Sequence, residues 1–219
     1  MGQRTITFAL DEYYHVYNRG TDKRTIFLDP HDYKRLIELL FLCNSTAPVN
    51  VRDIYRDYDS VFSYDRSEQL VAIGAYCLMP NHFHILLTPV VEGGVTKFMN
   101  KLGTSYSMYF NRKYQRTGAL FQGRFKGQHA SEDNYLKYLY AYIHLNPVKL
   151  VNSDWKENGI SNPEKVFDYL RTYSYSSMFD YLGMPRRESA VLNTTKFPDY
   201  FKTASQHQKE LVEWLMWSA

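Results

Sequence analysis

The sequence predicts an α+β fold, in which one antiparallel sheet carries helices on one face and a C-terminal helical extension follows. Three observations predict it. Short segments rich in aliphatic and aromatic residues alternate with longer segments whose apolar residues recur at helical spacing. Two of the strand segments are separated only by the turn Pro80-Asn81, so they form an antiparallel hairpin. The chain has 219 residues, which suffice for one full domain with appendages.

The first strand and the first helix have recognisable ends. Residues 13–18 alternate aromatic and polar side chains, and the turn Arg19-Gly20 closes the strand. Asp29-Pro30 opens a helix, because Pro fits the first helical turn. Residues 46–69 have no strong period, so we expect a surface insertion with room for a short helix. The apolar residues of the helix follow helical spacing and are Tyr33, Leu36, Ile37, Leu40 and Phe41.

The middle of the chain supplies the hairpin, a long helix and a further strand. Residues 70–78 are apolar almost throughout, as in a central strand, and residues 83–88 are the return strand. Residues 95–114 have the pattern of a long amphipathic helix. Residues 119–126 are the candidate for a fourth strand.

Another helix follows this strand. Ser131 is a good N-cap residue, and Pro147 ends the helix near residue 146. A final helix is expected over residues 206–217. The order strand, helix, strand, strand, helix, strand, helix matches a ferredoxin-like, split βαβ arrangement.

Composition indicates an ordinary globular protein. We expect one domain over residues 1–182, which includes the insertion, and a helical tail over residues 183–219. The sequence has no apolar run of about 18 residues and no apolar signal-peptide core, so we expect no membrane partner and a cytoplasmic location. Cys43 and Cys77 lie in apolar surroundings and are expected to be buried, reduced thiols.

The distribution of positive charge is more informative than the net charge of +3. Residues 112–116 and 124–126 combine five cations with two aromatic residues. Aromatic side chains between cations suit single-stranded nucleic acid, because bases stack on the rings and phosphates pair with Lys and Arg. The alternative is that most of the 20 Tyr residues are packing residues, and we expect this for most of them.

A pair of histidines begins the return strand of the hairpin. Successive side chains of a strand point to opposite faces, so His82 and His84 share one face and Phe83 and Ile85 share the other. Two imidazoles side by side on a strand provide half of a metal site. The alternative is a structural or incidental pair, which is common for two histidines at this spacing.

The helix before Pro147 carries a second group of candidate residues. Tyr142 and Asn146 are four residues apart and project from the same helical face. A phenol is a poor nucleophile at neutral pH, but a divalent cation bound to a phosphate makes phosphorus easier to attack. Two imidazoles and the Asn146 amide oxygen leave open coordination positions, which phosphate and water can complete for Mg²⁺ and which Mn²⁺ tolerates better.

These residues permit a transesterification, in which Tyr142 attacks a DNA phosphodiester, forms a phosphotyrosyl intermediate and releases a sugar hydroxyl. Other interpretations of the helix stay open. Tyr135, Tyr138 and Tyr142 form a stripe that is typical of core packing, and Asn146 could be a helix C-cap. His144 lies on another face and is expected to be structural.

Five segments of the chain resemble a known family, both in their residues and in their order along the chain. Together with the residues around them they cover roughly residues 13–182. The chain resembles the single-tyrosine HUH transposases, and within them the REP-associated tyrosine transposases of bacteria. The matching segments are YHVYNRG (14–20), YCLMPNHFHILL (76–87), YFNRKY (109–114), GALFQGRFK (118–126) and YLYAYIHLNPVK (138–149).

The resemblance implies that His82 and His84 bind the metal, that Tyr142 is the catalytic residue and that Asn146 is the third metal ligand. Related insertion-sequence transposases commonly have Gln or Glu at this last position, so Asn is a departure that fits the REP-associated branch. It further implies Mg²⁺ or Mn²⁺ as cofactor, single-stranded or hairpin DNA as partner, a nucleoid-associated location, and either a homodimer or a monomer.

By the same resemblance, seven residues are candidates for contact with DNA. Two rival functions remain: a domesticated protein that binds hairpin DNA without transposition, and a metal hydrolase that uses His82, His84 and water. The candidates for DNA contact are Asn18, Arg19, Arg112, Arg116, Gln122, Arg124 and Lys126.

Overall fold

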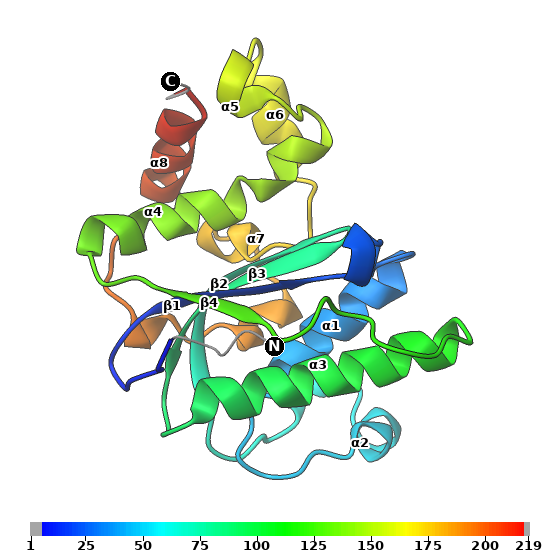
Figure 1. The fold of residues 1–219 in the computed structure, drawn as a ribbon. Coiled ribbons are helices and arrows are strands. Elements are labelled where there is room, and N and C mark those ends of the chain that lie inside the picture. Colours follow the sequence, from blue (N-terminus) through cyan, green and yellow to red (C-terminus); the bar gives the residue numbers. More distant parts are fainter. Residues whose placement is uncertain (1–5, 217–219) are drawn as a thin grey trace.

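Four strands form one antiparallel sheet with the order β2-β3-β1-β4 in the computed structural model, which describes residues 6–216 (Figure 1). Apart from the short insertion helix, the elements follow one another as strand, helix, strand, strand, helix, strand. The ferredoxin-like arrangement predicted from the sequence is therefore confirmed. The strands are β1 (Tyr14–Arg19), β2 (Val71–Met79), β3 (His82–Pro89) and β4 (Lys126–His129).

The helices α1 (Pro30–Leu42) and α3 (Gly94–Lys113) lie together on one face of the sheet (Figure 1). A capping box starts α1, because Asp29 accepts a hydrogen bond from the Asp32 backbone and Asp32 accepts one from the Asp29 backbone. The core on this face is apolar and includes Val16, Leu36, Leu40, Ile73, Ile85, Leu87, Phe98, Leu102 and Tyr106.

The helix α4 (Asp133–His144) lies on the opposite face of the same sheet, so the two faces have separate cores (Figure 1). The expectation that the helices lie on one face is therefore wrong, because β2 is buried on both of its faces. A bulge between Ile73 and Ala75 reverses the alternation of β2. Gly74 lies in the bulge, and a Cβ there would come within 2.8 Å of the Phe197 ring. The core on the α4 face includes Ala72, Ala75, Cys77, Met79, Leu86, Leu136, Leu139, Tyr140 and Ile143.

The segment after α4 covers the outer edge of β2. Its backbone exchanges hydrogen bonds with the strand at three points, where Tyr175 accepts from Leu78, and Ser177 and Asn193 donate to Tyr76 and Ile73. These bonds satisfy an edge that would otherwise be open for pairing. The remaining helices are α2 (Val51–Asp57), α5 (Trp155–Asn158), α6 (Pro163–Leu170), α7 (Met178–Tyr181) and α8 (Ala204–Met216), with 3-10 helices at Thr21–Lys23, Val61–Ser63, Asn146–Leu150, Arg187–Val191 and Thr194–Lys196.

Two expectations about the second half of the chain are wrong. The fourth strand is not 119–126 but Lys126–His129, because Gly118 and Gly123 have positive φ angles of 83° and 71° and place the residues between them in a loop. Ser131 is not the N-cap of α4; Glu132 occupies that position.

Other expectations hold within the described residues. The insertion at 46–69 contains the short helix α2, and α8 matches the expected final helix as far as residue 216. Residue 217, the last of that expected helix, lies outside the described residues. Cys43 and Cys77 are buried free thiols. Within residues 6–216, no helix has the length and apolar character needed to cross a membrane.

Candidate functional site

Strand β3 presents the two histidines to the face that α4 covers. Phe83 and Ile85 point into the core under α1 and α3, whereas His82 and His84 point the other way. The centroids of the two imidazole rings are 5.0 Å apart. The predicted sharing of one face is therefore confirmed.

Each of these histidines has a polar partner at Nδ1. The Nδ1 of His82 lies 2.6 Å from Oδ1 of Asn81, and the Nδ1 of His84 lies 2.8 Å from Nε2 of His15. These contacts leave Nε2 on both rings as the nitrogen available to a ligand. Histidines that bind metals usually have such a partner on the nitrogen that does not bind.

Burial keeps this group of rings neutral at pH 7. It lowers the pKa of His82 and His15 to about 4, and it lowers the pKa of His84 well below its usual value. The positive charge of Lys149 acts on His82 and His84 in the same direction. A neutral imidazole is the form that binds a metal, so either ring could bind a cation without first losing a proton.

Helix α4 brings Tyr142 against the histidines. One face of α4 packs on the sheet through Leu139 and Ile143, and this places Tyr142 at the border of the core, where it is half-buried. The Tyr142 ring lies edge-on to His84 and His15, with centroids 5.5 and 5.6 Å apart. Burial raises the pKa of the Tyr142 phenol, so the phenol is protonated at neutral pH.

The tyrosine stripe on α4 is only partly a packing feature. The rings of Tyr138 and Tyr142 are 6.0 Å apart, and Tyr138 packs on Trp214 of α8 at 4.6 Å. Tyr135, Tyr138 and Tyr142 are all half-buried, whereas the core positions of α4 are closed to solvent. Tyr142 is the member of the stripe that reaches the histidines.

Asn146 lies just after α4, at the start of the 3-10 helix Asn146–Leu150. Its Nδ2 donates a hydrogen bond of 2.8 Å to the backbone carbonyl of Tyr142. This bond uses the amide nitrogen, so the amide oxygen is the atom that could bind a cation. The Asn146 side chain is buried, with 4% of its surface exposed.

The donor atoms fit a divalent cation with several positions left open. Within residues 6–216, no three His, Cys, Asp or Glu side chains are grouped to hold a metal by themselves. The candidate set is two neutral imidazoles and one amide oxygen, from His82, His84 and Asn146. Water and phosphate oxygens would complete the coordination that Mg²⁺ or Mn²⁺ prefers.

Sequence reasoning missed two kinds of residue at this site. His15 and Asn81 are the partners of the histidine Nδ1 atoms. Lys156, on α5, places its Nζ 5.3 Å from the centre of the Tyr142 ring. His15 belongs to a segment that the sequence singles out, but its contact with His84 depends on the pairing of β1 with β3, in which His15 lies opposite Leu86.

The candidates for DNA contact fall into three groups. Arg19 lies opposite His82 in the β1–β3 ladder, and its side chain hydrogen-bonds with Gln122. Lys126 lies opposite Tyr17 in the β1–β4 ladder. Residues directly opposite in a ladder share a face, so Arg19 and Lys126 lie on the histidine face.

The second group lies on the other side of the same strands. Asn18 and Arg124 line a cavity of about 600 Å³ between α3 and the loop after it, and Asn18 donates to the Gly123 carbonyl. The third group consists of Arg112, in the last turn of α3, and Arg116, three residues after its end, which donates to Asn111. The structure does not bring the second and third groups to the histidine pair.

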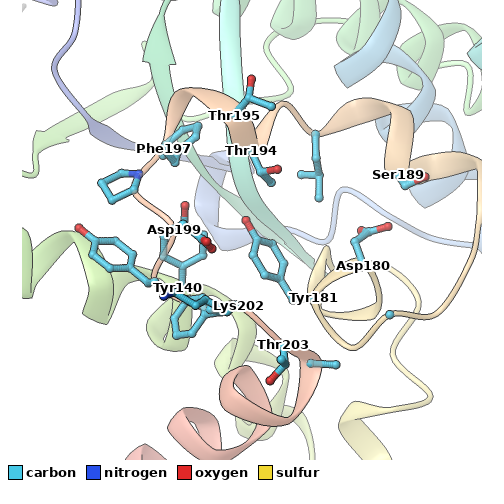
Figure 2. Close-up of a pocket in the computed structure, with 16 residues that line it drawn as sticks. Tyr140, Asp180, Tyr181, Ser189, Thr194, Thr195, Phe197, Asp199, Lys202 and Thr203 are labelled. Carbon is cyan, nitrogen blue, oxygen red and sulfur yellow. The ribbon is translucent and has the colours of Figure 1, made fainter.

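A further cavity, of about 700 Å³, lies between α4 and the C-terminal segment (Figure 2). Tyr140, Tyr181 and Phe197 point toward it from three different elements. None of the site residues predicted from the sequence lines this cavity. It therefore lies outside the histidine and tyrosine site.

The fold is similar to that of a solved protein, a REP-associated tyrosine transposase bound to a REP hairpin. The match has a TM-score of 0.51 and 14% sequence identity, and it covers 86% of this chain and 90% of the other. At this identity the likeness is one of fold. No curated protein matches the chain.

The amino-acid sequence itself matches the family described as "Transposase IS200 like". The match extends over residues 13–146, from the start of the first strand to Asn146, and includes His82, His84 and Tyr142. This is more than half of the 219 residues. The chain therefore belongs to the IS200-like transposase family.

Proposed function

We propose that this protein is a strand transferase of the REP-associated type, which cuts and rejoins single-stranded DNA beside hairpins with Tyr142 as the nucleophile. The observation that carries the proposal is the contact of the half-buried Tyr142 ring with His84, whose Nε2 is available. The family supports a DNA-acting transposase, and the structural neighbour is a protein bound to a REP hairpin.

The proposed reaction is a balanced exchange of ester bonds. The Tyr142 oxygen forms a bond to phosphorus, the bond from phosphorus to one sugar oxygen breaks, the phenolic proton passes to solvent and the sugar oxygen takes up a proton. Attack by another sugar hydroxyl reverses these steps and regenerates the phenol. No bond energy is lost, so rejoining needs no separate energy source.

The side chains of the site divide the work. His82, His84 and Asn146 would hold Mg²⁺ or Mn²⁺, which when bound would neutralise phosphate charge and polarise phosphorus for attack. The Lys156 ammonium beside the Tyr142 ring favours the phenolate as it forms. Arg19 and Lys126, on the same face, hold the phosphates that flank the cut.

One chain can supply the whole proposed site, since the Tyr142 ring contacts His84 of the same molecule. A monomer would then suffice for cleavage, as the resemblance to the REP-associated branch allows. Because its substrate is chromosomal DNA, we expect the protein to act at the nucleoid in the cytoplasm.

The test is a cleavage assay on hairpin oligonucleotides with single-stranded flanks, taken from palindromic repeats beside the gene, in the presence of Mn²⁺. Wild type should form a covalent protein–DNA adduct that survives denaturing electrophoresis, and Tyr142→Phe should form none. Tyr135→Phe, on the same stripe, is the matched control and should form the adduct.

Other outcomes identify the rivals. Nicking that survives in Tyr142→Phe would assign the protein to the metal hydrolases and reject Tyr142 as the nucleophile. Tight hairpin binding by wild type with neither adduct nor nicking would indicate a domesticated DNA-binding protein.

A further inference from the structure

His15 is a buried histidine that touches both halves of the proposed site. It lies on β1 with 4% of its surface exposed. Its Nε2 is 2.8 Å from Nδ1 of His84, and the two rings are stacked with centroids 5.0 Å apart. Its ring is also edge-on to Tyr142 at 5.6 Å.

The contact between His15 and His84 requires that one ring donates and the other accepts. A neutral imidazole carries one proton, on either Nδ1 or Nε2. If His84 donates from Nδ1, its Nε2 keeps a lone pair that can bind a cation. If His15 donates instead, His84 must carry its proton on Nε2, and that nitrogen cannot bind.

The neighbouring histidine shows which arrangement the site uses. The Nδ1 of His82 faces the side-chain oxygen of Asn81, and an amide oxygen can only accept. His82 therefore donates from Nδ1 and keeps a lone pair on Nε2. For His84 to carry its proton on Nδ1 as His82 does, the ring of His15 must accept a hydrogen bond from it, as the oxygen of Asn81 does from His82.

We propose that His15 is a positioning residue that holds His84 in the Nδ1–H tautomer, so that both histidines offer Nε2 to one cation beside Tyr142. The proposal rests on the function proposed above. His15 does not touch the cation or the DNA; it acts through the ring of His84 and packs against the nucleophile. Its place on β1 joins the proposed site to a strand of the sheet other than the one that carries the two ligands.

The first test needs no substitution. Long-range ¹⁵N–¹H spectra of the full chain, recorded without metal at pH 7.5, distinguish the two tautomers of each histidine. We expect the Nδ1–H form for both His82 and His84. The Nε2–H form for His84 in the wild type would overturn the proposal.

The second test uses substitutions at His15 and measures Mn²⁺ affinity by electron paramagnetic resonance in the absence of DNA. His15→Phe keeps an aromatic ring but removes the acceptor, and we expect affinity to fall about 10- to 100-fold. His15→Gln places an amide oxygen near the position of Nε2 and should restore affinity to within a few-fold of wild type. His31→Gln, on the exposed surface of α1, is the control and should bind as wild type does.

The outcomes separate this proposal from the proposed function. Equal Mn²⁺ affinity in His15→Phe and wild type would refute the role of His15 while leaving the role of Tyr142 intact. A wild type that binds Mn²⁺ with the expected tautomers but forms no adduct would refute the strand-transfer function and not the role of His15. A wild type that does not bind Mn²⁺ would refute both.

Discussion

Two pairs of buried histidines lie within residues 6–216, and they differ in the contacts of one ring nitrogen. In the first pair, His84 contacts His15 through Nδ1 and keeps Nε2 available. In the second pair, His144 contacts His207 through Nδ1 at 2.9 Å and the Ser177 hydroxyl through Nε2 at 2.8 Å. Burial lowers the pKa of His84 and of His144 in the same way. Burial and neutrality are common to both pairs, so the available Nε2 of His84 is the feature on which the proposed metal role depends.

The second pair instead joins elements of the fold. His144 is on α4, His207 is on α8, and Ser177 is bonded to the backbone of β2 at Tyr76. These contacts hold α4 and α8 to the edge of the sheet at β2. Substitutions at His84, His144 and His207 test whether the first pair acts in chemistry and the second in stability, and one at Lys156 tests the charge beside Tyr142.

The largest effect is expected at His84. His84→Ala should lower the rate of adduct formation by about 10²-fold or more, because cation binding at the phosphate contributes several kcal/mol to the transition state. The free energy of unfolding should also fall, because the change leaves a cavity and removes the partner of the buried His15, so the rates are compared below the melting temperature of both proteins. Single-turnover cleavage and urea unfolding measure the two quantities. A rate within a few-fold of wild type would remove His84 from the site.

At His144, a loss of stability is expected without a loss of activity. His144→Ala should lower the free energy of unfolding by about 2–4 kcal/mol, because it leaves a cavity and removes the partner of His207 and Ser177. Adduct formation below the melting temperature should stay within a few-fold of wild type. A loss of activity as large as that of His84→Ala, without a loss of stability, would contradict the division between the two pairs.

The fold and the candidate residues on β3 and α4 can be predicted from the sequence because they depend on local periodicity. Alternation along β3 places His82 and His84 on one face, and helical spacing places Tyr142 near Asn146. His15 could not be found in this way, because its contact with His84 depends on the register between two strands that are 69 positions apart at these residues.

Two other parts of the structure have non-local causes. The fourth strand begins at Lys126 because the preceding glycines adopt positive φ, and the sequence pattern of aromatic residues there resembles a strand. Lys156 reaches Tyr142 because the chain turns back after Pro147 and Trp155 is buried in a third core, which α4, α6 and α8 share. Neither the start of the fourth strand nor the contact of Lys156 with Tyr142 follows from the spacing of residues in the sequence.

The pH dependence of stability provides a smaller effect. Burial lowers the pKa of His207 to about 4, whereas an unfolded His titrates near 6.5. Between these values the unfolded state binds more protons, so stability is full above pH ~6.5 and falls as the pH decreases toward ~4. From pH 7.5 to 5.5 this residue accounts for roughly 1 kcal/mol of the loss.

His207→Gln should therefore reduce, though not remove, the decrease in melting temperature over that pH range, because the other buried histidines remain. Thermal melts at both pH values, with wild type alongside, measure the difference. An unchanged slope would show that His207 is not held neutral by the fold.

The smallest effect is expected at Lys156. An ammonium over an aromatic ring at an exposed site is worth about 0.5–1 kcal/mol, so Lys156→Ala should slow adduct formation roughly 2- to 5-fold. Lys209→Ala, a surface cation of α8, is the control and should not slow it. If Lys156→Ala slowed adduct formation as much as His84→Ala, Lys156 would do more than supply a positive charge near the phenol.

The identity of the nucleophile is the most direct test of the account. A wild-type adduct with hairpin DNA, digested with trypsin, should carry its nucleotide on the peptide of residues 138–149, which contains Tyr138, Tyr140 and Tyr142. Fragmentation by mass spectrometry should place the nucleotide on Tyr142. Attachment to Tyr138, or to any residue outside this peptide, would contradict the site described for this chain.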